Sequence, residues 1–415
     1  MGIVIIGGKP MKNILTYLGL IGIPLTLNTQ VKAQSITSRN LVLNTVTSGD
    51  GLYIDNDEEG RYIYKGGSPN NYLKLNNSLY RIISIEVDGK MKIVKNDANG
   101  TVYNSSSANF DTKENRKSTN SEDYCNSDYG CNVWGSNTTT LDSNSNNVTQ
   151  MPKGIGDKLY NLPDKEASLN TYLNTTWYNS LSDDIKKIIV DYIWNIGSVD
   201  YYYVKSDAPV SETLNEEATY KWKGKIALMN VTDYIKASTN PECNGFAAFR
   251  NYQAKESCHK NITSHNYLYS KISPWFLNPI SNPYYSQDNL HLDSANSSLT
   301  GVIDFNVATS TLGVRPAFYI SSETTLEGEG TKESPYTLYA PKDDEKDDEV
   351  DDKKANATDI IKDTIKDDKN SKTDNPQIVE VPATSAKASI IIASIGIIFI
   401  SLAIIVSRKM IKINN

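Results

Sequence analysis

The sequence predicts an α+β fold class, with one mixed, β-rich domain over residues 41–340 and two central helices. Three observations support this prediction. Apolar and polar residues alternate, as in strands, between residues 60 and 95, and apolar residues recur at helical spacing between residues 168 and 196. Strand-like segments return after residue 267. Strands before and after a helical centre favour an α+β domain.

The first part of this domain contains the clearest hairpin. Residues 60–66 and 71–95 alternate in the manner of strands, and residues 80–85 and 91–94 flank the pair Asp88-Gly89. Asp-Gly tolerates the positive φ that a tight turn needs. Residues 101–150 follow and consist mainly of Ser, Asn, Thr and Asp, so we expect a long surface loop or insertion there.

Two helices are predicted in the middle of the domain. The first begins with Ser168 as N-cap, and its apolar face contains Leu169, Tyr172, Leu173 and Trp177. The second begins at Ser182 and ends at Gly197, with an apolar stripe of Ile185, Ile188, Ile189, Tyr192, Ile193 and Ile196. We expect the stripe of the second helix to lie in the core.

The rest of the domain is predicted to contain a buried strand at 225–229, a short helix at 232–237, and strands at 267–274, 302–307 and 313–320. An aromatic, Pro-rich loop is predicted from 274 to 285. Aromatic side chains in loops commonly stack on sugars or contact peptides, so the candidate ligand contacts are Trp275, Tyr284 and Tyr285. The alternative is that Trp275 and Phe276 pack in the core.

Both ends of the chain predict export and anchoring. Residues 1–33 have the pattern of a signal peptide: a basic start at Met11-Lys12, an apolar stretch, and a cleavage site after Ala33. Translation starting at Met11 would fit this pattern better, and the alternative is an uncleaved N-terminal anchor. Residues 388–406 carry no charge and are long enough to form a transmembrane helix, and the basic residues after it predict a cytoplasmic tail.

Between the domain and this span lies an acidic linker, residues 341–381. Its charged and small polar residues bury too little apolar surface to fold, so we expect a disordered stalk. Residues 381–385 (VPATS) resemble the cell-wall sorting pentapeptide of Gram-positive surface proteins, with Val381 in place of the usual Leu and Ser385 in place of the usual Gly. The resemblance implies cleavage by a sortase between Thr384 and Ser385, and attachment to the cell wall.

Four cysteines form two local pairs, Cys125 with Cys131 and Cys243 with Cys258. An even number in an exported chain predicts two disulfides. A zinc site that adds His259 and His265, and free thiols in a low-oxygen habitat, are the alternatives.

Motifs for metal binding or catalysis are incomplete. Asp55, Asp57 and Glu59 resemble the start of a calcium loop, but Gly66 occupies the position of its bidentate acid, so an acidic turn is the preferred interpretation. The three histidines lie in no HExxH motif, and no serine lies in a GxSxG motif. Cys258 with His291 is the remaining catalytic alternative. We therefore predict a protein that is not an enzyme and has no cofactor or metal.

The net charge of −7 argues against nucleic acid as a partner, because binding phosphates requires basic patches.

The domain also resembles an extracellular domain of unknown function found in surface proteins of Gram-positive bacteria (Firmicutes). The stretches that carry the resemblance are SGDGLYIDNDEEGRYIYKG, NNYLKLNNSLYRIISIEVDGKMKIVKND, LNTYLNTTWYNSL, KGKIALMNVTDYIKASTNPEC, GVRPAFYIS and EGEGTKESPYTL. The strand with Gly313-Val314-Arg315-Pro316 is similar to the last strand of C-type-lectin-like folds, which implies a lectin-like domain. The sugar-and-calcium motif of true C-type lectins does not occur, so calcium-dependent sugar binding does not transfer.

Together these features predict a cell-surface, single-pass membrane protein with an extracellular domain that binds a glycan or a protein ligand. The alternatives are a wall-associated hydrolase and a purely structural surface component.

Overall fold

The computed structural model describes residues 35–340, except 97–107, 117–124, 126, 153–158, 251–253, 282–287 and 294–299. The chain divides into two units, Met1–Asp343 and Asp344–Asn415, and all described residues belong to the first. The signal peptide with Ala33, the acidic linker, Thr384, Ser385 and the predicted membrane span lie outside the described residues. Among those described, no helix combines the length and the apolar character that crossing a membrane requires.

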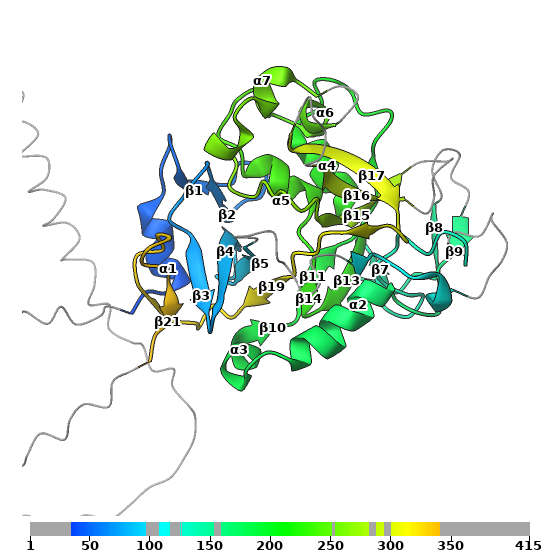
Figure 1. Cartoon of the computed structure of the whole chain (residues 1–415), viewed down its shortest axis with the longest axis horizontal. Helices are drawn as coiled ribbons and strands as arrows, with labels where there is room; N and C mark the ends of the chain where they lie inside the picture. Colours follow the sequence, from blue (N-terminus) through cyan, green and yellow to red (C-terminus); the bar gives the residue numbers. More distant parts are fainter. Residues whose placement is uncertain are drawn as a thin grey trace, which may run out of the picture. The chain divides into compact units, whose positions relative to one another are not determined.

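The observed fold class is α+β, rich in strands, as the sequence predicts. The largest sheet has eight strands in the order β1-β2-β4-β5-β19-β10, with β3 beside β4 and β14 beside β19. Figure 1 shows β19 next to the blue and cyan strands of the first hundred residues. The strands are β1 (Gly51–Ile54), β2 (Tyr62–Lys65), β3 (Tyr72–Leu75), β4 (Ser78–Ile85), β5 (Met91–Lys95), β10 (Ile189–Val190), β14 (Ile226–Ala227) and β19 (Ala317–Ile320).

The predicted hairpin is confirmed. β4 pairs antiparallel with β5, and Ile85 lies opposite Met91. Gly89 in the connecting turn has a φ of 79°, the left-handed conformation for which glycine is favoured. The short strand at 225–229 is also confirmed as β14, and the helix at 232–237 as α5 (Val231–Lys236).

The second central helix is much shorter than predicted. α3 (Asp183–Ile188) ends where β10 begins, and β11 (Tyr192–Asn195) follows. The apolar residues of this segment fit a helical period, but β-branched and aromatic residues also favour strands. The backbone of β10 pairs with β19 and that of β11 with β13, so strand pairing decides the conformation.

The first central helix is confirmed, with its start shifted by one residue. α2 (Ser168–Tyr172) has Ala167 as N-cap and continues directly into the π-helical turn η3 (Leu173–Trp177). Leu169, Leu173 and Trp177 are buried, as the predicted apolar face requires.

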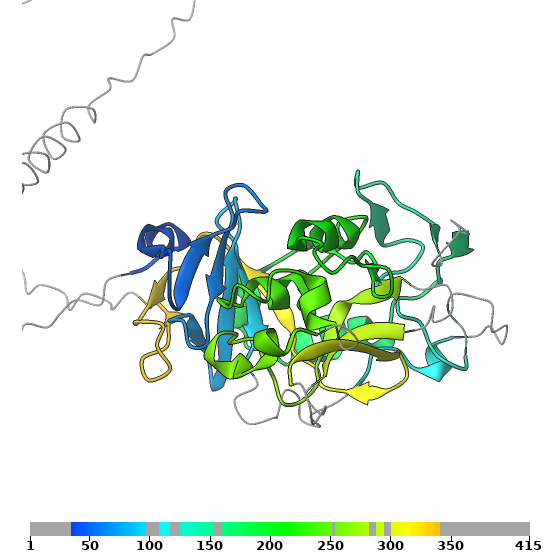
Figure 2. The ribbon, with the colours of Figure 1, turned by 90° about the horizontal axis from the view of Figure 1, so that it is seen from above.

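Three smaller groups of strands complete the β structure. One sheet has the order β11-β13-β7, a second has the order β12-β15-β16-β17, and three two-stranded ribbons pair β18 with β6, β20 with β21, and β8 with β9. Figure 2 shows β15–β17 on the opposite side of α5 from the blue strands. The bounds are β6 (Ala108–Asn109), β7 (Thr140–Asp142), β8 (Gln150–Pro152), β9 (Leu159–Asn161), β12 (Val199–Asp200), β13 (Tyr220–Gly224), β15 (Trp275–Ser281), β16 (Asp288–Asp293), β17 (Val302–Val307), β18 (Thr311–Leu312), β20 (Leu326–Glu327) and β21 (Thr337–Leu338).

The other helical segments are short. They are α1 (Ser38–Leu41), η1 (Val42–Asn44), η2 (Lys113–Asn115), α4 (Val210–Glu217), α6 (Phe246–Phe249), α7 (Glu256–His259) and η5 (Ile262–Ser264).

Two sequence-based predictions about loops are wrong. The strand predicted at 267–274 is absent, and the strand begins at Trp275, within the predicted aromatic loop. The segment 101–150 is not only a surface loop, because Phe110 and Trp134 are fully buried and pack together with ring centroids 5.6 Å apart. Large aromatic side chains in an otherwise polar segment bury enough surface to tie it to the core.

The core is one large cluster that joins all three main sheets, with a small satellite of Cys131, Val133, Met151 and Leu162. The helices α2, α4 and α5 add apolar side chains to this core, among them Leu169, Val210 and Tyr234. This arrangement leaves a cleft where the large sheet, the three-stranded sheet and α5 meet.

Candidate functional site

The candidate site is this cleft, which has a volume of about 580 Å³ and is called the central cleft below. Residues from seven separate segments form its wall. The lining residues are Glu58 and Arg61; Glu86, Asp88, Lys90 and Lys92; Asp191, Tyr192, Ile193 and Asn195; Leu214 and Glu217; Lys221 and Lys223; Asn230, Thr232 and Asp233; and Tyr319.

Arg61, the residue before β2, forms ion pairs with four carboxylates. Its guanidinium lies 2.9 Å from Asp55, 2.6 Å from Glu58, 3.2 Å from Glu86 and 3.4 Å from Asp233. Burial lowers the pKa of Arg61, but these four carboxylates raise it by more, so it lies well above its ordinary value. Arg61 therefore stays charged and holds four acidic side chains in place.

Lys92 on β5 forms the second centre of charge. Its Nζ lies 2.6 Å from Oδ2 of Asp233 and 3.0 Å from Oδ1 of Asn230. The same ammonium lies 5.2 Å from the ring centroid of Trp194 and 5.7 Å from that of Tyr319, within range of a cation–π interaction. Burial raises the pKa of Asp233, but Lys92 and Arg61 lower it by more, so this carboxylate is ionised.

Asn230 and Asp233 owe their positions to the start of α5. Asn230 is the N-cap and Asp233 the third residue of the helix, and each side chain bonds the other's backbone N–H in a capping box. The Oδ2 atom of Asp233 accepts the N–H of Asn230 at 2.8 Å. The local sequence Asn-Val-Thr-Asp thus orients two polar groups of the cleft.

One wall of the central cleft is aromatic. Tyr192 on β11 stacks on Tyr319 of β19, with ring centroids 3.6 Å apart. Trp194, two residues further along β11, packs edge-on against Tyr319, with ring centroids 4.8 Å apart. Tyr192 is half-buried and the neighbouring Ile193 is exposed, so this wall offers apolar surface to a ligand.

Glu217, the last residue of α4, is a buried carboxyl group. Its oxygens accept hydrogen bonds from the backbone N–H of Thr232 at 2.9 Å and from the Thr232 hydroxyl at 2.5 Å. Burial raises the pKa of Glu217 to about 8, although both hydrogen bonds lower it. The group is therefore mainly protonated at neutral pH.

The acidic turn before β2 is neutralised by protein cations. Lys236 at the end of α5 places its Nζ 2.6 Å from Asp55, and 3.4 Å from both Asp57 and Glu58. Two cations, Lys236 and Arg61, thus occupy the centre of the turn that resembles half a calcium loop. Over the residues that the structure describes, no cluster of three or more His, Cys, Asp or Glu is arranged to hold a metal ion.

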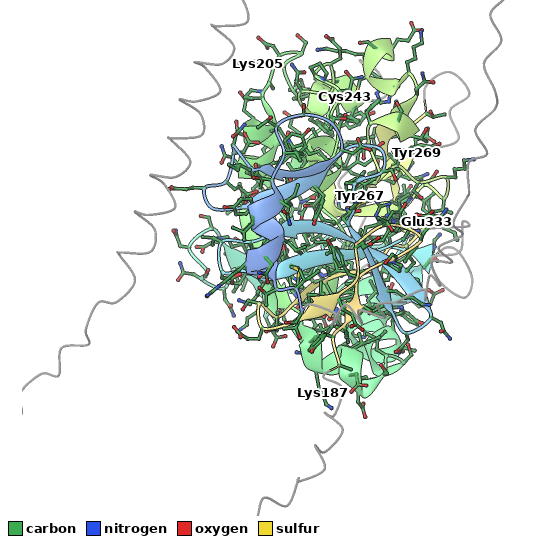
Figure 3. The ribbon with its side chains drawn as sticks, turned by 90° about the vertical axis from the view of Figure 1, so that its left-hand side faces the viewer. Lys187, Lys205, Cys243, Tyr267, Tyr269 and Glu333 are labelled. Carbon is green, nitrogen blue, oxygen red and sulfur yellow. A yellow bond between two sulfur atoms is a disulfide. The ribbon has the colours of Figure 1, made fainter. Side chains whose placement is uncertain are left out.

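Both predicted disulfides are present, Cys125–Cys131 and Cys243–Cys258. Cys258 therefore has no thiol to serve as a nucleophile with His291 or as a zinc ligand with His259 and His265. The ring nitrogens of His259 instead lie 3.0 Å from the carbonyl oxygens of Thr300 and Ala248. Figure 3 shows Cys243 near one end of the domain and Lys187 of α3 at the other.

Trp275 is not a surface ligand contact. Its side chain is fully buried, and its Nε1 donates to the carbonyl oxygen of Ala108 at 2.9 Å. The core-packing alternative therefore holds for Trp275 and also for Phe276, because β15 is an inner strand of its sheet and both side chains are fully buried in the main core. Tyr284 and Tyr285 lie outside the described residues.

The sequence interpretation named none of the residues that line the central cleft as candidate site residues; Asp88, Tyr192 and Ile193 appeared there only as turn or core residues. One signal was available: Lys92 is a lysine inside the apolar strand 91–94, where a charge requires a partner. A second was the capping-box spacing of Asn230 and Asp233.

Comparisons of the chain with protein-family models, with curated proteins and with solved structures found no match. The central cleft is therefore interpreted from its own geometry.

Proposed function

We propose that this protein recognises a glycan or protein ligand outside the cell and that the central cleft binds it. The observation that carries the proposal is the aromatic wall of Tyr192 and Tyr319 beside a floor of paired charges. Arg61 and Lys92 are already paired with Asp233, so an ionic ligand gains little from these three groups. A ring face favours the apolar face of a sugar or a peptide side chain.

The surface location is part of the same proposal. The two disulfides are consistent with export, because such bonds persist in oxidising surroundings. The signal peptide, the acidic stalk, the membrane span and sorting at Thr384 and Ser385 remain predictions from the sequence, as does the lectin-like fold. In this arrangement the stalk holds the domain away from the membrane.

A hydrolase acting on the cell wall is the second candidate, and Glu217 is the observation that favours it. A buried carboxyl group that stays protonated at neutral pH, in a cleft, is the kind of group that acts as a general acid. Its neighbour Asp233 is held by Lys92 and Arg61, however, and both oxygens of Glu217 already accept hydrogen bonds from Thr232. Recognition therefore fits the geometry better.

Binding of the purified full-length protein to a glycan and host-matrix array, with and without chelator, tests the proposal. We expect a specific ligand whose affinity falls about tenfold or more in Tyr192→Ala, since the stacked ring is lost. Tyr203→Ala is the matched control, because Tyr203 is exposed and does not line the cleft. An equal loss of ligand affinity in both variants would contradict the proposal. So would an array on which the wild-type protein binds no ligand.

The same preparation distinguishes the second candidate. Turnover of wall fragments by the wild-type protein that disappears in Glu217→Gln would establish the hydrolase instead. An absence of turnover together with ligand binding supports recognition.

A further inference from the structure

Lys92, Asn230 and Asp233 form a triad whose members are all almost completely buried, with exposures of 3%, 5% and 2%. The amine nitrogen of Lys92 lies 3.0 Å from the side-chain carbonyl oxygen of Asn230 and 2.6 Å from a carboxylate oxygen of Asp233. The three groups come from β5 and from the first turn of α5. Ion pairing accounts for Lys92 and Asp233, and helix capping accounts for the place of Asn230. Neither requires the amine of Lys92 to contact the side-chain carbonyl group of Asn230.

The amide of Asn230 has one defined orientation. Its Nδ2 donates to the carbonyl oxygen of Asn195 at 2.6 Å and to Oδ1 of Asn278 at 3.1 Å. Both partners are acceptors, so the NH₂ group faces them and the carbonyl group faces Lys92. The backbone N–H of Asp233 also donates to the Asn230 side chain. Two donors, Lys92 and this N–H, therefore polarise the carbonyl group.

We propose that Lys92 and Asn230 become joined by an intramolecular isopeptide bond. Lys92 transfers a proton from its ammonium group to the carboxylate of Asp233, and the neutral amine then attacks Cγ of Asn230. The backbone N–H of Asp233 stabilises the negative charge that develops on Oδ1. The Nζ–Cγ bond is now formed, Asp233 gives its proton to the departing nitrogen, the Cγ–Nδ2 bond breaks, and one ammonia leaves. Nζ then loses its extra proton to the carboxylate of Asp233, which releases it to ammonia or water, so the product is a neutral amide and Asp233 is again a carboxylate.

The surroundings favour such a reaction in three ways. The fold holds amine and amide in contact, which replaces an encounter in solution by a high effective concentration. Trp194 and Tyr319 exclude water from one side of the amine. The triad lines the central cleft, which provides a route for ammonia to leave. Arg61 stabilises the anionic form of Asp233 and so slows the first proton transfer, but a bond that forms once per molecule requires no rapid turnover.

Lys236 provides an internal comparison. It is 5% exposed and lies 2.6 Å from Asp55, much as Lys92 lies against Asp233. Its ion-pair partners are the carboxylates of Asp55, Asp57 and Glu58, and an ionised carboxylate is a poor electrophile. The proposal thus assigns the bond to Lys92 and not to Lys236.

Peptide mass spectrometry of the full-length protein tests the bond. After reduction, alkylation and cleavage at Lys and Arg, we expect residues 91–95 to be recovered joined to residues 226–236. The mass should equal the sum of the two peptides minus one ammonia, about 17 Da. Fragment ions should place the link between Lys92 and Asn230, and a loss of water instead would place it on a carboxyl group and overturn the proposal.

Variants assign the roles. Lys92→Arg and Asn230→Ala should abolish the joined peptide, Asp233→Asn should slow its appearance in freshly purified protein, and Lys236→Arg should retain it. The wild-type protein decides the question even if a variant fails to fold. Cleavage after Lys92, with residues 91–92, 93–95 and 226–236 recovered as separate peptides from folded wild-type protein after prolonged incubation, would overturn the proposal. The measurement involves no ligand, so it is independent of the proposed recognition function.

Discussion

At the scale of single residues, the interior of this domain is unusual for the number of ionisable groups it contains. Arg61, Lys92 and Lys236 are buried together with Asp55 and Asp233. Each cation contacts at least one carboxylate, so the cost of removing these charges from water is offset by their mutual attraction. Removing one partner leaves a buried charge without compensation, which makes the network sensitive to single substitutions.

Glu217 supports a prediction about pH. Its folded-state pKa of about 8 lies above the ordinary value of 4.5. Between these values the unfolded chain releases a proton that the folded protein retains, so the contribution of Glu217 to stability is complete below pH 4.5 and is lost as the pH rises towards 8. In Glu217→Gln this loss should disappear, and the side-chain amide can still bond Thr232.

Urea unfolding of wild type and Glu217→Gln between pH 5 and pH 8 measures the effect. The free energy of unfolding of the variant, relative to wild type, should rise by a few kcal/mol over this range, at roughly 1.4 kcal/mol per pKa unit. Parallel curves for the two proteins would show that Glu217 ionises normally in the folded state.

At the scale of elements, the segment from α3 to β11 shows how strand pairing overrides a helical pattern. Ile189 and Val190 pair with Ile320 and Tyr319 of β19, and after one intervening residue β11 pairs with β13 in a different sheet. Asp191 thus marks the point where the chain changes sheets. That change places Tyr192 against Tyr319 and creates the aromatic wall of the central cleft.

The two disulfides should differ in what they contribute to stability. Cys243–Cys258 spans a sequence separation of 15 residues and Cys125–Cys131 one of 6, and the longer loop restricts the unfolded chain more. We expect Cys243→Ala/Cys258→Ala to lower the free energy of unfolding by about 3 kcal/mol and Cys125→Ala/Cys131→Ala by about 2 kcal/mol. Urea unfolding of both double variants measures this. A larger loss for the shorter loop would contradict the expectation and indicate that packing of the satellite cluster dominates.

At the scale of the whole molecule, β19 connects parts of the chain that are far apart in sequence. It pairs with β5, β10 and β14, and Phe318 at its centre packs against Tyr80 at 5.4 Å and Trp177 at 6.3 Å. β19, which lies late in the domain, is therefore required before the large sheet and the helical segment α2–η3 form one core. We infer that the described part of the chain unfolds as one cooperative unit.

Phe318→Ala tests this inference. Truncation of a fully buried phenylalanine should lower the free energy of unfolding by about 3–5 kcal/mol, through lost burial and the cavity left behind. Leu43→Ala, at a site that is 79% exposed, should have no measurable effect. Circular dichroism in the far and near ultraviolet should report the same transition in each protein. Two separate transitions in wild type would contradict a single cooperative unit.

The sequence by itself determined the features that depend on near neighbours. The hairpin of residues 80–95 follows from strand alternation and the Asp-Gly turn, and the buried face of α2 follows from helical spacing. Local cysteine pairs and an even count were enough to predict both disulfides. In each case the interacting residues lie within a few turns or strands of one another, so local geometry sets the outcome.

Only the tertiary structure decided the strand character of residues 189–195, the burial of Trp275 and the existence of the central cleft. Each depends on partners that are distant in the sequence. Ile189 pairs with Ile320, and Trp275 donates a hydrogen bond to Ala108. Lys92 contacts Asn230 and Asp233. A hydrophobic pattern predicts that a side chain is buried, but it does not predict which residues that side chain packs against. The choice among partners is made when the whole chain packs, because a strand or a buried charge is stable only once its partner is in place.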